Sequence, residues 1–260
     1  MRARLHGKQS AAARQQQQKW NEMMFTENSI EMPSREIPVG RRRSGAAPAM
    51  SIPVGCSGTA LQRSNGQMIF NEGDEVRHYY KVVTGRVRLY KMRADGRRQI
   101  VEFLIPGDVF GLECGTEHTL IAEAIGRTAL ERYPYGQIER LGDEQPDVGH
   151  RMMTMLQRNL SAVRHHMVML GQDTAKERVA AFLALLAARF GMTGSGVLDL
   201  GMGRQDIADY VGLALETVCR ELTTLEHDGL IEVMDHRQVA ISNLTALQSL
   251  ADGQSALLLR

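Results

Sequence analysis

Short apolar runs separated by turn residues characterise residues 55–137. Val87 and Leu89 alternate with Arg86, Arg88 and Tyr90, which is the period of a strand. Asp95-Gly96 is a two-residue hairpin signal, and the apolar run over residues 100–105 is typical of a strand buried on both faces. Glycines recur at the ~8–12-residue spacing of small all-β domains. They are Gly66, Gly73, Gly85, Gly96, Gly107, Gly111 and Gly115. The pattern predicts a β-roll or jelly roll.

The apolar period lengthens over residues 138–172. Steps of four and three residues alternate there, which predicts one long helix with a heptad-like apolar seam. The seam residues are Val148, Met152, Met155, Asn159, Val163, His166 and Leu170. A single helix after a closed roll can bury such a seam against a second copy of itself, so we expect a parallel homodimer held by Met152, Met155, Asn159, Val163, His166 and Leu170. The alternative is a helix that folds back on its own roll.

Residues 173–250 change pattern again. A helix is predicted over 175–190, a short strand over 197–200, and two short helices between 204 and 225. Gly212 lies at the turn between these two helices, where a positive φ is commonly needed. The second helix would bury residues spaced by three and four, namely Leu215, Val218, Leu222 and Leu225. Two strand signals, 230–234 and 239–241, complete a winged helix-turn-helix.

The second short helix also has an outward face. Glu216, Cys219, Arg220 and Thr223 are spaced so that they project together. The first residues of such a helix reach base edges in the major groove, where Arg suits guanine and Glu accepts a hydrogen bond from cytosine. The alternative interpretation is a surface ion pair between Glu216 and Arg220, which contributes only a few tenths of a kcal/mol.

Composition narrows the class of protein. The chain has 260 residues with 43% hydrophobic positions, which excludes wholesale disorder. No apolar run approaches the ~18–20 residues of a membrane span, and the N-terminus has no apolar signal region. Three cysteines exclude a disulfide scaffold and favour a cytoplasmic protein. Residues 1–54 hold a glutamine run and the basic triplet Arg41–Arg43, and we expect a mostly disordered tail there.

Several motifs resemble the Crp/Fnr family of bacterial transcription regulators over about residues 56–250. Residues 216–220 (ETVCR), preceded by RQDIA at 204–208, are similar to the recognition signature of the Fnr branch. In the roll, DGRRQI, PGDVFGLE and AEAI resemble the FixK subgroup. The resemblance implies an α+β protein with a cyclic-nucleotide-binding-like β-roll (55–137), a dimerisation helix (138–172) and a C-terminal winged helix-turn-helix (173–250).

The family also implies a function. We expect a homodimer that binds double-stranded DNA at a TTGAT…ATCAA-type palindrome, with Arg220 on guanine and Glu216 on the opposite cytosine. Such regulators usually activate transcription through RNA polymerase, and FixK-like members belong to low-oxygen and nitrogen-fixation circuits. The residues expected at the DNA are Arg204, Gln205, Glu216, Thr217, Cys219, Arg220, Thr223 and Arg237.

Two positions depart from the family pattern. Cys219 stands where serine is usual, so we regard it as a redox candidate: oxidation would place a negative group against DNA. The alternative is a small residue tolerated beside a thymine methyl. Ala214 stands where many relatives carry a Ser or Thr helix cap, and alanine loses about 1 kcal/mol of capping.

Cofactor sites of the family are not expected here. An iron–sulfur cluster usually needs four cysteine ligands, and the chain has three, namely Cys56, Cys114 and Cys219, with no C-x-x-C motif. No iron–sulfur cluster is therefore predicted. In the nucleotide cassette, Leu112 and His118 stand where Glu and Arg are needed, so no cyclic nucleotide is expected. His165 and His166 are not expected to bind metal, and no catalytic motif is present. A roll that binds an effector or haem and gates DNA binding is the alternative.

The total charge argues weakly against a nucleic-acid partner. The chain carries 31 Lys and Arg against 30 Asp and Glu. The predicted DNA-binding segment, residues 173–241, is acidic, with six basic and eleven acidic residues. We therefore expect few phosphate contacts per subunit and an affinity that depends on dimerisation and base readout.

Overall fold

The structure is a computed structural model that describes residues 58–113, 115–136 and 146–253. The expected tail over 1–54, together with Cys56 and Cys114, lies outside these residues. None of the helices in the described part is both long and apolar enough to cross a membrane.

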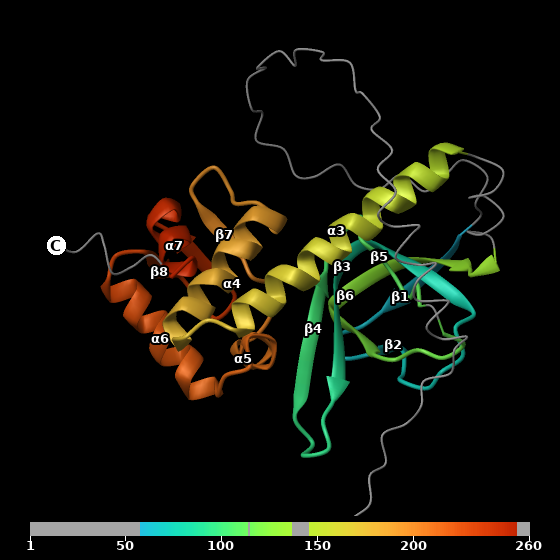
Figure 1. Ribbon diagram of the computed structural model, residues 1–260, viewed down its shortest axis with the longest axis horizontal. Coiled ribbons are helices and arrows are strands. Elements are labelled where there is room, and N and C mark those ends of the chain that lie inside the picture. The colour runs from blue at the N-terminus through green and yellow to red at the C-terminus, as the bar shows by residue number, and fades with distance from the viewer. Residues whose placement is uncertain (1–57, 114, 137–145, 254–260) are drawn as a thin grey trace, which may run out of the picture. The chain divides into compact units, whose positions relative to one another are not determined.

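The N-terminal domain is the predicted β-roll (Figure 1). Its strands are β1 (Thr59–Arg63), β2 (Met68–Phe70), β3 (His78–Met92), β4 (Arg98–Leu104), β5 (Val109–Phe110) and β6 (Ile121–Pro134). They pair antiparallel in the order β1-β6-β3-β4, with β2 on β6 and β5 on β3. The hairpin predicted at Asp95-Gly96 is confirmed, because Met92 pairs with Arg98. Its turn is longer than the two residues expected: the Arg93 amide donates to the Arg97 carbonyl oxygen, and Gly96 has the positive φ (79°) of the last loop residue.

The central parts of strands β3 and β4 are covered on both faces. Val87 and Leu89 lie in the core of the roll with Phe70, Phe110 and Leu130. Tyr90, Ile100 and Phe103 belong instead to a second core, which they share with the C-terminal domain. The expectation that residues 100–105 form a strand buried on both faces is confirmed for Ile100, Phe103 and Leu104. Packing of the C-terminal domain on this face is what buries Tyr90 as well.

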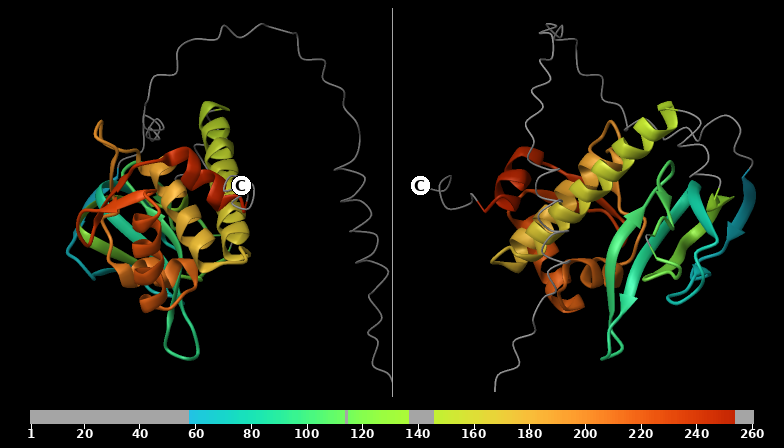
Figure 2. Two further views of the ribbon diagram at one scale, coloured as in Figure 1. Left: turned by 90° about the vertical axis from the view of Figure 1, so that its left-hand side faces the viewer. Right: turned by 45° about the vertical axis from the view of Figure 1, so that its right-hand side comes forward.

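Two helices connect the roll to the C-terminal domain. Helix α3 spans Pro146–Leu170 and α4 spans Ala175–Phe190, which matches the predicted range of the latter. A capping box starts α4, because Thr174 accepts from the Glu177 amide while the Glu177 carboxylate accepts from the Thr174 amide. The two helices pack against each other, as both views of Figure 2 show.

The C-terminal domain is a winged helix-turn-helix. Its elements are β7 (Val197–Asp199), α5 (Arg204–Val211), α6 (Leu215–His227), β8 (Ile231–Val233), β9 (Gln238–Ile241) and α7 (Leu244–Ala251), with sheet order β7-β9-β8. Gly212 adopts the left-handed conformation (φ 70°) at the turn between α5 and α6, as predicted. Helix α7 was not predicted from the sequence; Asn243 caps it, and it packs against α4.

Candidate DNA interface

Helix α6 has the two faces that its sequence predicted. Val218, Leu222 and Leu225 are buried against the domain, and Leu215, the fourth residue expected there, is half-buried. On the other side, Glu216, Cys219, Arg220 and Thr223 are exposed together, and Thr217 is half-buried between the two faces. Ile207, Ala208 and Val211 of α5 are also buried, and the small Ala208 lets the two helices approach closely. The fold therefore presents a polar helix face of suitable size for the major groove.

Arg220 is the exposed cation of this face. Its side chain is 68% exposed and pairs with Glu221, whose carboxylate is 3.2 Å from Nη2. The partner is thus the next residue along the chain and not Glu216, which lies one turn earlier. Because the guanidinium itself is exposed to water, its ion pair contributes little, and Arg220 can exchange it for a guanine edge at small cost.

Helix α6 begins without a side-chain cap. Ala214 is the N-cap residue and its side chain makes no capping hydrogen bond, as the sequence predicted. The first amides of a helix need acceptors and carry the positive end of the helix dipole. The start of α6 is therefore suited to an anionic acceptor such as a DNA phosphate.

Arg204 is half-buried rather than fully exposed. Its Nη2 donates to the Asp235 carbonyl oxygen at 3.2 Å, and its Nη1 is buried without a partner among the described residues. Burial lowers the pKa of Arg204, and the nearby Cys219, Asp235 and Glu226 partly offset this. This expected DNA-contacting side chain therefore connects the start of α5 to the turn of the wing.

The wing is held to α6 by a second contact. The Glu226 carboxylate accepts a hydrogen bond from the Val233 amide at 2.8 Å. Arg237 is exposed at the tip of the wing, and Gln205 is exposed on α5, where it donates to Asp209 at 2.7 Å. Arg237, Gln205 and the outward face of α6 thus belong to one rigid unit.

The long helix α3 has apolar residues on two sides. Its exposed large apolar residues include Met153, Leu156, Leu160, Val163 and Met167, each between 48% and 68% exposed. Their spacing alternates between three and four residues, so they form one stripe. We call these five residues the α3 stripe. Asn159 of the expected seam is also exposed, while the side chains of Met152 and Met155 lie outside the described set.

Two residues of the expected seam face their own chain, which corrects that part of the interpretation. His166 is buried, stacks on Tyr210 with ring centroids 4.0 Å apart, and hydrogen-bonds the Tyr210 carbonyl oxygen at 3.0 Å. Leu170 approaches Gly212 at the turn of the helix-turn-helix. The reason is that α5 packs against this side of α3. Burial lowers the pKa of His166 and raises that of Tyr210 to about 12.

In the segment where relatives bind a cyclic nucleotide, the side chains of Glu113, His118 and Thr119 contact one another. The Glu113 carboxylate accepts from the Thr119 amide and hydroxyl, each at 2.8 Å, and is 2.9 Å from His118 Nδ1. The His118 ring is buried and stacks on Phe70. Burial alone would raise the pKa of Glu113, but the hydrogen bonds from His118 and Thr119 together lower it.

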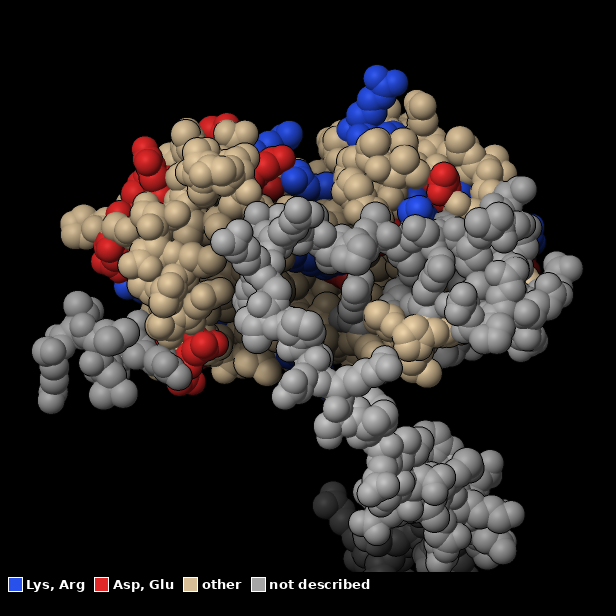
Figure 3. Space-filling model, turned by 90° about the horizontal axis from the view of Figure 1, so that it is seen from above, with Lys and Arg blue, Asp and Glu red and all other residues tan. Residues whose placement is uncertain are grey.

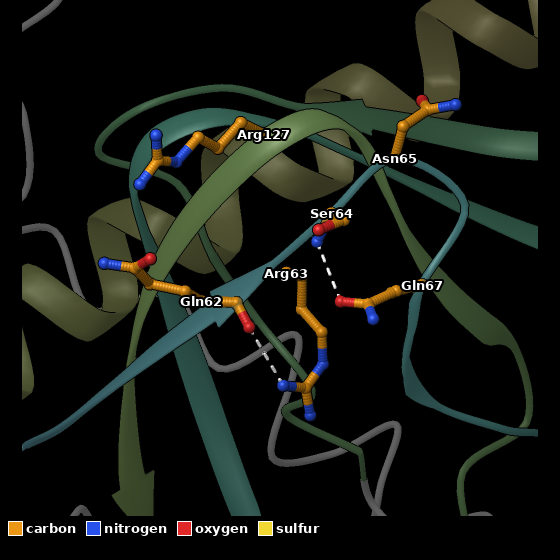
Figure 4. A pocket seen from close by; sticks show the side chains of 6 residues that line it. All are labelled: Gln62, Arg63, Ser64, Asn65, Gln67 and Arg127. Carbon is orange, nitrogen blue, oxygen red and sulfur yellow. Dashed lines mark hydrogen bonds between the residues drawn. The ribbon is translucent and has the colours of Figure 1, made fainter.

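A separate hollow of about 420 Å³ lies at the β1–β2 turn, and its wall is polar (Figure 4). The lining residues are Gln62, Arg63, Ser64, Asn65, Gln67 and Arg127. The Arg63 guanidinium is engaged by the carbonyl oxygens of Gln62 and Met68. No group of metal-binding side chains occurs within residues 58–113, 115–136 and 146–253.

A roll of the cyclic-nucleotide-binding type, followed by a long helix and a winged helix-turn-helix with an exposed polar recognition face, defines a DNA-binding transcription regulator. The cyclic nucleotide-binding domain family matches residues 61–145, and the Crp-like helix-turn-helix domain matches residues 177–250. The chain belongs to the Crp/Fnr family and is similar to its FixK members.

Individual relatives support the assignment to this family. The nitrogen fixation regulation protein FixK of Bradyrhizobium diazoefficiens is 39% identical over 75% of this chain and 82% of its own length. FixK of Rhizobium meliloti is 38% identical over 72% and 84%. The structure of FixK2 from Bradyrhizobium japonicum has a TM-score of 0.70 at 39% identity, with 75% of this chain and 97% of that chain covered. Both curated FixK proteins are named as regulators, in agreement with the expectation that the chain is not an enzyme.

Proposed function

We propose that this regulator acts as a homodimer on a TTGAT…ATCAA-type palindrome, in low-oxygen or nitrogen-fixation gene control. The observation that carries the proposal is the exposed face of α6, with Glu216 and Arg220 one helical turn apart. Arg220 reads guanine and Glu216 accepts from the opposite cytosine. Contact with RNA polymerase then makes the bound dimer an activator.

The dimer is formed through the α3 stripe. Its five apolar residues are exposed in a single chain, and a continuous exposed apolar stripe on a helix indicates a partner. A parallel pairing of two such helices buries both stripes and brings two recognition helices to the same side. That geometry matches a palindromic site.

DNA binding in this proposal needs no cyclic nucleotide and no iron–sulfur cluster. The Glu113 carboxylate is satisfied by His118 and Thr119 and is not free to accept from a ribose. The role of FixK relatives in nitrogen fixation supports the physiological context. A roll that binds an effector or haem remains the competing function.

Fluorescence polarisation with a labelled TTGAT…ATCAA duplex tests both functions. Purified protein without added effector should bind this duplex at least about 10³-fold more tightly than a scrambled duplex at the same salt concentration. Binding that appears only after cyclic AMP or haem is added would favour the gated sensor. Equal affinity for both duplexes would contradict sequence-specific binding.

Cys219 supplies a redox control of this activity in the proposal. It is an exposed free thiol on the outward face of α6, near the Arg204 guanidinium. Peroxide converts a thiolate to a sulfenic acid, and further oxidation adds negative charge. Such a group at the DNA surface repels phosphate and base acceptors, so oxidation switches binding off.

A further inference from the structure

The roll holds the first helix of the helix-turn-helix through two arginines. Arg88 of β3 places Nη1 2.8 Å from Asp206 Oδ1, and its Nη2 pairs with Glu123 of β6. Arg98 of β4 places Nη2 2.9 Å from Asp209 Oδ2 and 3.2 Å from Asp206 Oδ1. Arginines from two neighbouring strands thus pair with two carboxylates that lie on one face of α5.

These ion pairs are largely shielded from water. The side chains of Arg88 and Asp206 are 13% and 10% exposed, and that of Glu123 is 7% exposed. Buried ion pairs contribute little net stability, because desolvation offsets the attraction, but removing one partner is costly. Guanidinium–carboxylate contacts are also directional. Their main effect is therefore to fix one arrangement of the two domains.

The attachment fixes rotation as well as position. Asp206 and Asp209 are one helical turn apart, so contacts to both prevent α5 from turning about its axis. The second oxygen of Asp206 accepts from the Gly203 amide at the start of α5, at 3.4 Å, and Gln99 donates to the Asp209 carbonyl oxygen at 3.0 Å. Figure 1 shows the β3–β4 hairpin beside α5.

The orientation of α5 determines the orientation of the recognition helix α6. The turn at Gly212 connects α5 to α6, and the apolar faces of the two helices pack together. On its other side α5 contacts the dimerisation helix α3 through the His166–Tyr210 stack. Helix α5 is thus fixed between the roll and α3, and α6 has one defined position relative to α3.

Arginines of the roll compensate part of the acidic surplus of the DNA-binding domain. Asp206 and Asp209 pair with Arg88 and Arg98, and Asp199 pairs with Arg86 at 3.2 Å. These three carboxylates are compensated from the roll, so they do not face DNA as unpaired charges. Other acidic side chains are scattered over the C-terminal domain on the face shown in Figure 3.

We propose that Arg88 and Arg98 are positioning residues for DNA recognition, because they hold α5 and so set the separation and rotation of the two recognition helices in the dimer. The consequence is selectivity for the spacing between half-sites. One extra base pair moves a half-site by about 3.4 Å along the duplex and rotates it as well. This inference rests on the proposed function as a dimer on a palindrome.

The test measures affinity for palindromes whose spacer is native, one base pair shorter or one base pair longer, and for a duplex with a single half-site. Arg98→Met removes the ion pairs with Asp206 and Asp209 but keeps a long unbranched side chain. Methionine is tolerated there because the Arg98 side chain is only 25% exposed. Arg97→Met is the matched control, because the Arg97 guanidinium is exposed and pairs with Asp95 in the hairpin turn, away from α5. Arg88→Lys is a second variant that keeps the charge but loses the paired donors.

Wild-type protein should prefer one spacer strongly. In Arg98→Met this preference should fall by about tenfold, equivalent to roughly 1.4 kcal/mol, while single half-site affinity stays unchanged. Arg88→Lys should act in the same direction and carries the test if Arg98→Met does not fold. An unchanged spacer preference, or an equal change in Arg97→Met, would overturn the inference. Wild-type protein that binds no spacer would instead refute the proposed function and, with it, the inference.

Discussion

Replacing Leu160 by alanine should weaken the dimer through loss of buried apolar surface. Leu160 lies in the middle of the α3 stripe and is 50% exposed in the single chain. Alanine has the highest helix propensity, so the substitution leaves α3 itself intact. Any change in association therefore comes from the lost contact with the partner helix.

The size of the effect follows from that exposure. Burying a whole leucine side chain contributes about 1.5–3 kcal/mol, so the half that a partner would cover contributes roughly 1 kcal/mol per protomer. Both protomers carry the change, which makes about 2 kcal/mol per dimer. The dimer dissociation constant should therefore rise roughly 30-fold.

Analytical ultracentrifugation across a concentration series measures this constant. Ser161→Ala is the matched control, because Ser161 is exposed on the same helix next to Leu160 but lies off the stripe. An unchanged constant in Leu160→Ala would refute the assignment of the stripe as the dimer contact. A large rise in Met155→Ala instead would favour the seam expected from sequence alone.

Four further substitutions test the site and its supports. Arg220→Ala should cost about 1–3 kcal/mol of binding to the TTGAT site and relax the preference for guanine, as measured with base-substituted duplexes; a uniform loss on all duplexes would make Arg220 a phosphate contact. Cys219→Ser should bind DNA equally before and after peroxide, whereas the wild type loses binding; a variant that stays sensitive would point to Cys56 or Cys114. Ala214→Ser should add about 1 kcal/mol to the free energy of unfolding in urea by capping α6, and no gain would contradict the capping argument. His166→Phe should make stability less dependent on acid: because burial lowers the pKa of His166, the unfolded chain takes up a proton first, so wild-type stability falls as the pH drops below about 6.5. Equal pH slopes for wild type and variant would contradict this.

Local patterns predicted much of the recognition unit. The spacing of Val218, Leu222 and Leu225 identified the buried face of α6, and Glu216 and Arg220 followed as the exposed one. Gly212 and the Asp95-Gly96 pair identified two turns, because a positive φ or a tight hairpin restricts the residue type. These features depend on residues within a few positions of one another.

Contacts between distant segments could not be predicted from local sequence patterns. Arg204 reads as a surface cation in sequence but bonds the wing at Asp235, thirty-one positions later. Arg88 and Tyr90 read as the polar side of a strand, yet the C-terminal domain buries them. The sequence of β3 does not indicate that Arg88 pairs with a carboxylate of α5. A charged residue in a strand gives the same sequence pattern whether its charge is solvated by water or paired with a distant side chain.

The long helix separates the two contributions most clearly. The sequence by itself determined that α3 forms, that it is apolar along its length, and that its period suits a partner helix. Only the tertiary structure decided which side meets which partner. His166 and Leu170 pack on α5, while Leu160 and the rest of the α3 stripe are left exposed. The physical reason is that periodicity records how often apolar residues recur, whereas the identity of the surface they bury depends on where the folded chain places its other elements.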